Sequence, residues 1–502
     1  MHKTFLRVLT ALPAVALQAL AIYAVYTWLS PYSTTINIVL EVLAVLLVLF
    51  ILMKRDEPSY KTLWLMVILA FPVAGALLYL LFGNKRTTRP LARRLDMVTP
   101  KVKANNDEIM GILREQSPRL AQTFQYVYNK TGYPVMENEG AKYYPLGDDM
   151  FPDMLEDLKR AEKYIYVEYF IINHGLMFDS IVDILKEKAA AGVDVRLMYD
   201  DVGSISTFSA HERFKLRESG IRCVAFNPVL AIGGTLNYRD HKKMLIIDGK
   251  IAYTGGINLA DEYINHIERF GHWKDIGFRI TGKPVACFIE MFLQFWNAFA
   301  ERQAEEAIFE LPDYTPEEQN ERVPDGFVLS FCNSPLSDES ISNSLYIDIL
   351  SLASNYVWFY TPYLTPGSEL QEAMIRAAER GVDVRIIMPG IPDKKLIFRM
   401  SRSYYKTLMD GGVKIYEYTP GFVHAKACLA DDLVGAIGTV NLDYRSLFLH
   451  FENNSLFYEA SLLKDLKADF VDSMDKSVLQ TPNNRRRRRL LDGILRIFAP
   501  LC

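Results

Sequence analysis

Three long apolar stretches set the first 83 residues apart from the rest of the 502-residue chain. They cover Phe5–Leu29, Ile36–Met53 and Leu63–Phe82, and the third contains no charged residue. A membrane-crossing helix needs about 20 apolar residues, so the pattern predicts an N-terminal, multi-pass transmembrane helical region. A cleaved signal peptide is the alternative for the first stretch, and the absence of a clear small-residue cleavage site argues against it.

From Phe124 onward, short apolar runs alternate with amphipathic segments. Tyr164–Val167 and Val193–Leu197 are typical of strands, and Ser180–Ala191 is typical of a helix. This alternation predicts an α/β fold with mixed sheets flanked by helices.

The α/β part repeats one pattern. Ala161-Glu-Lys-Tyr-Ile-Tyr resembles Ala353-Ser-Asn-Tyr-Val-Trp, and Gly192-Val-Asp-Val-Arg-Leu resembles Gly381-Val-Asp-Val-Arg-Ile. Between the copies, Glu301–Asp325 holds eleven charged residues and three prolines, as a linker does. We therefore expect two pseudo-symmetric halves with the functional site at their seam.

These patterns divide the chain into six parts. We expect membrane-anchoring segments at 1–83, a basic linker at 84–118, the first half at 119–310, an acidic linker at 311–325, the second half at 326–480, and a basic amphipathic tail at 481–502.

Charge narrows the choice of partners. The net charge is only −4, so no global basic field favours nucleic acid. The exception is Arg485–Arg489, five consecutive arginines followed by an apolar pattern up to Phe498. This tail is predicted to be an amphipathic helix on anionic lipid, with a disordered basic tail as the alternative. The five cysteines are widely spaced, and no Cys/His or carboxylate/His spacing indicates a metal site.

The strongest signal is a motif that occurs once in each half. In both copies a histidine is followed by Lys at +2, Asp at +7, Gly at +14 and Asn at +17. Four matched offsets within a wider repeat exclude coincidence. The two sets are His241, Lys243, Asp248, Gly255 and Asn258, and His424, Lys426, Asp431, Gly438 and Asn441.

The residue types suit chemistry at phosphorus. Residues i and i+2 of a strand share a face, so each His and its Lys should project into one site. Imidazole is a nucleophile and proton carrier near neutral pH, and lysine places positive charge against phosphate oxygens without a metal. Asn258 and Asn441 offer amide donors to the same oxygens. One histidine would form a phosphohistidine while the other acts as general acid and base.

The carboxylates of the motif region divide into two groups. Asp275, at +34 from His241, and Glu452, at +28 from His424, are predicted to orient the histidines. Asp248 and Asp431 are candidate catalytic residues, but their odd offset equally favours a structural role at the following turn. Arg239 is left open between headgroup binding and a solvated strand end.

The paired motifs resemble the HKD motifs of the phospholipase D superfamily. Leu80-Leu-Phe-Gly, Trp273-Lys-Asp275 and the segment Gly438–Ser446 resemble bacterial cardiolipin synthases, and the resemblance covers the chain from about residue 36 to the end. It implies two phospholipase D-like halves and an enzyme of the bacterial cell membrane that needs no cofactor. The implied reaction converts two phosphatidylglycerol molecules to cardiolipin and glycerol.

Several points stay open at this level. A phospholipase D that uses water and a phosphatidylserine synthase are the alternatives within the superfamily, whereas a nuclease or a scaffold is disfavoured. Basic residues from Lys85 to Arg94 favour a catalytic part that faces the cytoplasm. The resemblance favours His241 over His424 as the nucleophile, and the oligomeric state is left open.

Overall fold

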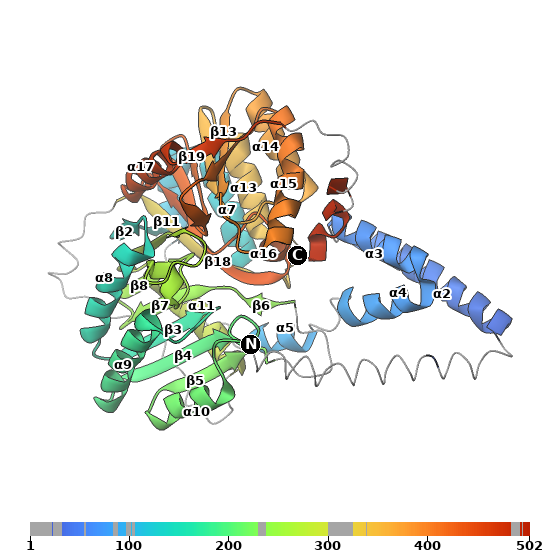
Figure 1. Ribbon diagram of the computed structural model, residues 1–502. Coiled ribbons are helices and arrows are strands. Elements are labelled where there is room, and N and C mark those ends of the chain that lie inside the picture. The colour runs from blue at the N-terminus through green and yellow to red at the C-terminus, as the bar shows by residue number, and fades with distance from the viewer. Residues whose placement is uncertain are drawn as a thin grey trace.

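The computed structural model describes residues 33–54, 57–83, 89–96, 106–228, 237–299, 325–337, 339–482 and 495–501, with a few single positions between them. Two mixed sheets with helices against their faces form an α/β body, and a helical hairpin projects from it (Figure 1). The predicted apolar stretch before residue 30 (apart from Tyr23), the predicted linker between the halves (apart from Asp325) and Arg485–Arg489 lie outside the described residues.

The first half contains a seven-stranded sheet in the order β2-β10-β8-β7-β3-β4-β5. β3, β4 and β5 run parallel to one another, and the remaining pairs are antiparallel. The strands are β2 Ala141–Tyr144, β3 Tyr164–Tyr169, β4 Asp194–Asp200, β5 Arg222–Phe226, β7 Lys243–Ile247, β8 Ile251–Gly255 and β10 Gly277–Thr281. The helices are α8 Gly147–Lys159, α9 Leu176–Ala190, α10 Ala210–Glu218 and α11 Val285–Phe299.

The second half contains a ten-stranded sheet with the main order β1-β11-β18-β17-β16-β12-β13-β14-β19. Its strands are β1 Met136–Glu137, β11 Phe327–Asn333, β12 Tyr356–Tyr360, β13 Asp383–Pro389, β14 Lys414–Tyr418, β16 Ala427–Ala430, β17 Val434–Gly438, β18 His450–Tyr458 and β19 Ser477–Leu479. The helices are α13 Ile341–Leu352, α14 Ser368–Glu379, α15 Lys395–Asp410, α16 Tyr444–Phe448 and α17 Leu462–Asp475.

The two sheets share one strand order, which confirms the repeat. β10-β8-β7-β3-β4-β5 of the first half corresponds to β18-β17-β16-β12-β13-β14 of the second. In each half a parallel trio joins an antiparallel trio, and the motif lysine begins or immediately precedes the strand at the junction.

Two short strand pairs join the halves. β6 (Arg239–Asp240) of the first half pairs parallel with β18 of the second, and β15 (Gly421–Val423) of the second pairs parallel with β9 (His272–Lys274) of the first. Each pair lies immediately before a motif histidine, so the backbone of each half supports the motif of the other.

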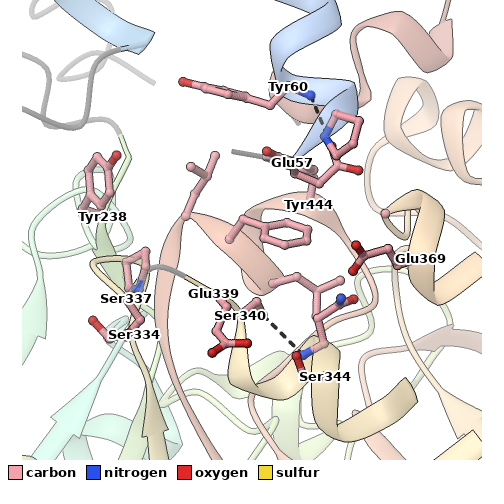
Figure 2. Close-up of a pocket in the computed structure, with 17 residues that line it drawn as sticks. Glu57, Tyr60, Tyr238, Ser334, Ser337, Glu339, Ser340, Ser344, Glu369 and Tyr444 are labelled. Atoms are coloured by element: carbon pink, nitrogen blue, oxygen red, sulfur yellow. Dashed lines mark hydrogen bonds between the residues drawn. The ribbon is translucent and has the colours of Figure 1, made fainter. Parts of the chain in front are cut away.

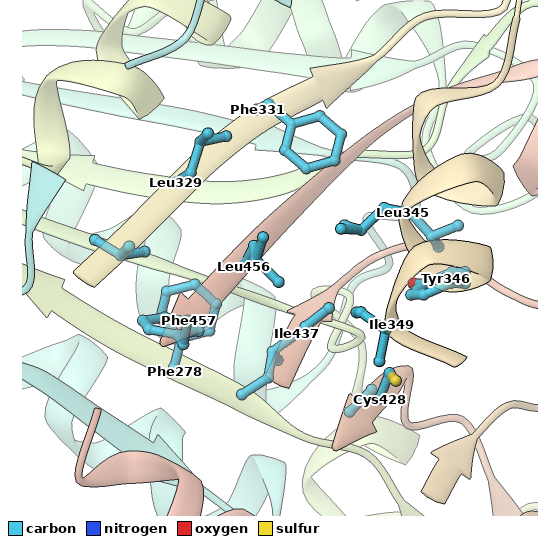
Figure 3. Packing of buried hydrophobic residues seen from close by; sticks show 14 of the residues in the cluster. Phe278, Leu329, Phe331, Leu345, Tyr346, Ile349, Cys428, Ile437, Leu456 and Phe457 are labelled. Carbon is cyan, nitrogen blue, oxygen red and sulfur yellow. The ribbon is translucent and has the colours of Figure 1, made fainter. Parts of the chain in front are cut away.

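A hydrophobic core extends across the seam. In Figure 3, Phe278 of the first half lies beside Phe457 of β18, in one buried cluster with side chains of β11, β17 and α13 of the second half. The rings of Phe278 and Phe457 meet edge to face, with centroids 5.2 Å apart. Burial of such a side chain stabilises by roughly 1.5–3 kcal/mol. A shared core of this kind holds the halves in one fixed arrangement.

The N-terminal hairpin consists of α2 (Ser33–Met53), α3 (Pro58–Ala70), α4 (Pro72–Leu78) and a π-helical turn at Tyr79–Gly83. Among the described helices, none has both the length and the apolar character that a membrane crossing requires. The predicted transmembrane region is not confirmed by this finding. The predicted apolar stretch over 63–82 divides at Pro72, which lacks a backbone N–H and so interrupts the helical ladder.

The hairpin has an exposed apolar surface and a contact with the body. Val42, Leu46 and Leu49 of α2 are each more than half exposed. At the other end, the ring of Tyr60 on α3 stacks on Tyr444 of α16 at 5.9 Å. The hairpin therefore meets the body beside the helix that follows the second motif.

The basic linker predicted over 84–118 also contains structure. α5 (Arg89–Asp96) and α6 (Asn106–Gln116) lie there, and α7 (Pro118–Thr131) follows and packs on α13. Leu95, Met110 and Leu113 are buried in the main core, so the described helices of this segment pack on the body.

The end of the chain packs on protein where it is described. Arg496 hydrogen-bonds Thr407 of α15 at 3.0 Å and lies over the ring of Tyr404, and Ala499 is buried. This part of the predicted lipid-binding tail is therefore used at least partly in contacts with the body.

Candidate active site

The two motif histidines lie at the seam. The backbone N–H of His241 donates to the carbonyl of Phe451 at 2.8 Å, and that of His424 donates to the carbonyl of Lys274 at 2.7 Å. Both contacts join one half to the other, and they continue the short strand pairs β6–β18 and β15–β9. Each histidine is thereby placed beside the other half's carboxylate, because Glu452 lies on β18 and Asp275 directly follows β9.

The histidine–carboxylate pairs are crosswise. His241 Nδ1 lies 2.8 Å from Glu452 Oε2, and His424 Nδ1 lies 2.6 Å from Asp275 Oδ2, with all four residues buried. The sequence pattern counted each carboxylate from the histidine of its own copy, but the structure pairs it with the histidine of the other. When the carboxylate accepts from Nδ1, the proton lies there and Nε2 is the basic nitrogen.

The two pairs are built differently. A Cβ on Gly256 would lie 2.0 Å from Asp275 Oδ1, so only glycine leaves room for this shorter carboxylate. The corresponding residue of the second half is Thr439, whose hydroxyl donates to Glu452 Oε2 at 2.5 Å. Asp275 thus packs against the backbone of Gly256, whereas Glu452 accepts a hydrogen bond from the side chain of Thr439.

The motif lysines are buried beside the histidines. Lys243 Nζ donates to the carbonyl of His241 at 2.7 Å, and Lys426 Nζ lies 2.8 Å from His424 Nδ1. Burial lowers the pKa of Lys243 to about 7 and that of Lys426 to about 8. Desolvated ammonium groups of this kind are ready to gain a counter-ion, which an anionic phosphate would supply.

Burial also keeps both histidines neutral in the free protein. It lowers the pKa of His424 to about 4 and holds the pKa of His241 well below its ordinary value, and nearby lysine charge acts in the same direction. A neutral imidazole has a lone pair on Nε2, which a nucleophile or a base requires.

The two asparagines are only partly available to a ligand. Asn258 donates to the hydroxyl of Tyr263 at 2.8 Å and accepts from the backbone of Ile171 at 3.0 Å. Asn441 donates to Asp443 at 3.2 Å. Each amide has two N–H groups, so the predicted phosphate contact would use the second one.

Asp248 and Asp431 have the same structural role in the two halves, which is one of the two roles that their odd offset left open. Each adopts φ of +52° and accepts from three consecutive backbone N–H groups at the start of a strand, at 2.7–2.9 Å. The donors are Glu162, Lys163 and Tyr164 for Asp248, and Ser354, Asn355 and Tyr356 for Asp431. Both carboxylates therefore fasten the end of the motif strand to its neighbour.

Residues on either side of His241 form buried ion pairs. Arg239 pairs with Asp200 at 2.9 Å, so it is neither a solvated strand end nor a headgroup ligand. Lys242 lies between Glu168 at 2.5 Å and Asp240 at 3.2 Å. The partners lie up to 74 positions away in the chain, so their pairing has no signature in the local sequence.

His450 lies beside the site, although the sequence shows no partner for it at motif spacing. Together with His241 and Glu452 it forms the one group of potential metal ligands within the described residues, with ligand atoms within 4.8 Å of one another. Spacing along the chain did not indicate this cluster, because its members come from both halves. The donor set does not suit a metal, however, because Arg445 Nε donates to His450 Nε2 at 3.2 Å and so leaves the proton on Nδ1.

A separate cavity of about 280 Å³ lies between the start of α3 and the second half (Figure 2). Glu57, Glu339 and Glu369 line it, and its described lining contains no Lys, Arg or His. An anionic phosphate would be repelled there, so the phosphate chemistry belongs to the histidine and lysine cluster.

Comparison with known proteins agrees with this geometry. The family model of the cardiolipin synthase phospholipase D-like domain matches residues 154–286 and 346–474, and the phospholipase D-nuclease N-terminal model matches 42–84. A cardiolipin synthase of Alkalihalophilus pseudofirmus is 31% identical over 93% of this chain and 94% of its own. An uncharacterized protein of Streptococcus mutans is 42% identical over 87% of this chain and 95% of its own.

The fold also matches a solved structure. Phosphatidylserine synthase of Haemophilus influenzae aligns with a TM-score of 0.56 and 16% identity over 76% of this chain and 97% of its own, which shows a shared fold. The two halves and the crosswise histidine pairs define a phospholipase D-type protein. More narrowly, the chain belongs to the phospholipase D-like cardiolipin synthase family, a family of phosphatidyltransferases.

Proposed function

We propose that this chain is a cardiolipin synthase that moves a phosphatidyl group from one phosphatidylglycerol to another and releases glycerol. The observation that carries the proposal is the seam itself. Two buried histidines, each held at Nδ1 by a carboxylate of the other half, lie with two buried lysines around one site. This arrangement supplies a nucleophile, a second proton carrier and positive charge for phosphate oxygens.

The reaction would proceed in two steps. His241 Nε2 attacks phosphorus, and the bond from phosphorus to the headgroup oxygen breaks as His424 gives that oxygen a proton. His424 then takes the proton from a hydroxyl of the second phosphatidylglycerol, whose oxygen attacks phosphorus and displaces His241. The substrate's negative charge favours protonated His424, which burial disfavours in the free protein.

The site of action would be the cytoplasmic face of the bacterial cell membrane. The exposed apolar residues of α2 suit contact with lipid. Anionic lipid is then both substrate and surface, and no cofactor enters the reaction.

The test uses the purified full chain and phosphatidylglycerol labelled in its headgroup, supplied as the sole lipid substrate. Cardiolipin and labelled free glycerol in equal amounts are expected, and His241→Ala and His424→Ala serve as inactive controls. Phosphatidic acid in place of cardiolipin would show a hydrolase. A serine-dependent phosphatidylserine product would show the other transferase.

A further inference from the structure

The two orienting carboxylates differ in the residue that stands two positions before them. Trp273 precedes Asp275, whereas His450 precedes Glu452. His450 is 93% buried, and its ring centroid lies 5.6 Å from that of His241. The pair that holds His241 therefore has a neighbouring imidazole, where the pair that holds His424 has a neighbouring indole.

Arg445 determines which nitrogen of His450 carries the proton. Its Nε lies 3.2 Å from His450 Nε2, and a guanidinium donates hydrogen bonds but never accepts them. Nε2 must therefore accept. Burial, with the positive charge of Arg445, holds the pKa of His450 well below its ordinary value, so the ring is neutral and has its single proton on Nδ1.

That N–H faces the oxygen of Glu452 that His241 does not use. His450 Nδ1 and Glu452 Oε1 are 3.9 Å apart, and neither atom meets the geometric criteria for a hydrogen bond among the described residues. The hydroxyl of Ser446 lies near Glu452 and lowers the pKa of its carboxyl, against the larger rise that burial causes. Glu452 Oε2 is already used by His241 and Thr439. A separation of 3.9 Å is too long for a hydrogen bond, but contacts of this kind shorten in the reacting complex.

We propose that His450 is a positioning residue for His241. Oriented by Arg445, it donates its Nδ1–H to Glu452 Oε1 as the imidazole of His241 gains charge, and so keeps Glu452 ionised and its other oxygen on His241 Nδ1. The inference rests on the proposed function, because it assumes that His241 forms the phosphorus–nitrogen bond. It gives the buried Oε1 a partner at the moment when the charge of Glu452 is needed.

Two variants test this. His450→Phe keeps a planar ring and removes the donor, and His450→Asn places an amide N–H close to the position of Nδ1. The assay follows a single turnover with a substrate whose leaving group needs no proton. His450→Phe should slow formation of the phosphatidyl adduct on His241 by about 10- to 100-fold. The substrate concentration that gives half the maximal rate should stay unchanged. His450→Asn should restore most of the rate, which replacement of a merely structural ring would not do.

A matched control is Trp273→Phe, the equivalent ring change before the other carboxylate, and adduct formation in this variant should be close to that of the unmodified protein. Wild-type adduct rates in His450→Phe, or equal losses in the Phe and Asn variants, would overturn the proposal. If His450→Phe does not fold, Arg445→Met replaces it and should slow the same step. Absence of cardiolipin from the unmodified enzyme would instead refute the proposed function, and the adduct measurement separates the two failures.

Discussion

Replacing Asp275 with Asn should disable His424, although Asp275 follows His241 in its own half of the chain. Its Oδ2 lies 2.6 Å from His424 Nδ1, and both groups are buried. The amide has nearly the same size but no charge, so it neither fixes the Nδ1–H tautomer nor stabilises the imidazolium. Loss of an orienting carboxylate costs from about 10²-fold to about 10⁴-fold in rate.

Glu452→Gln should disable His241 for the same reason. The rate of cardiolipin formation does not distinguish the two variants, because both histidines act on one phosphorus. The covalent intermediate does. When His424 is disabled, slow attack by His241 continues but release lacks its base, so an adduct should accumulate in Asp275→Asn. When His241 is disabled, Glu452→Gln should form little or none.

Quenched enzyme is digested, and the phosphatidyl group is located by mass spectrometry. The expected result is an adduct on His241 in Asp275→Asn, at a level similar to that in His424→Ala. The double variant Asp275→Asn/His424→Ala is the matched control and should be no slower than His424→Ala, because both changes remove one function. An adduct that accumulates in Glu452→Gln but not in Asp275→Asn would refute the crosswise assignment.

Three further outcomes are expected. Activity should survive EDTA, and loss on chelation with recovery on adding a divalent ion would contradict the argument that Arg445 leaves no metal-binding lone pair on His450. Gly256→Ala should reduce synthesis sharply because the new Cβ would overlap Asp275, whereas Thr439→Ser, which keeps the hydroxyl, should retain most of the activity under the same assay. Burial lowers the pKa of Lys243 from 10.5 to about 7. Between these two pH values Lys243 is protonated in the unfolded chain but not in the folded chain, so the free energy of unfolding rises with pH across this window. Lys243→Met should therefore raise the unfolding temperature below pH 7 and abolish synthesis, with the gain shrinking towards pH 10 in a calorimetric series.

The repeat and the motif residues could be predicted because their information is local. Strands have a period of two, and the paired offsets repeat in both copies, so the α/β halves and the site at the seam follow from spacing. The odd offset of Asp248 and Asp431 from the histidines also predicted that they lie on the other face of the strand. Both carboxylates accept from backbone N–H groups and do not contact the histidines.

The contacts between the halves could not be predicted in this way. Glu452 is 211 residues from His241, and Asp200 is 39 residues from Arg239, so no local pattern links them. Both pairings depend on strand order and on the short pairs at the seam. The apolar stretch Leu63–Phe82 is not one continuous helix, for a different reason. Hydropathy averaged over the stretch does not register the interruption that Pro72 makes.

The contacts between the halves explain why equivalent positions of the repeat have different residues around the two histidines. Asp275 is one methylene shorter than Glu452, so it reaches its histidine only if the chain at Gly256 comes within contact distance. The longer Glu452 leaves space that Thr439 fills with a hydroxyl donor, and His450 supplies a second N–H towards its free oxygen. These differences give a nearly symmetric pair of histidines unequal surroundings. In the proposed two-step transfer, one imidazole would hold the phosphatidyl group while the other moves protons. The better supported carboxylate faces His241, and the assignment of His241 as the nucleophile stays a prediction from the sequence resemblance.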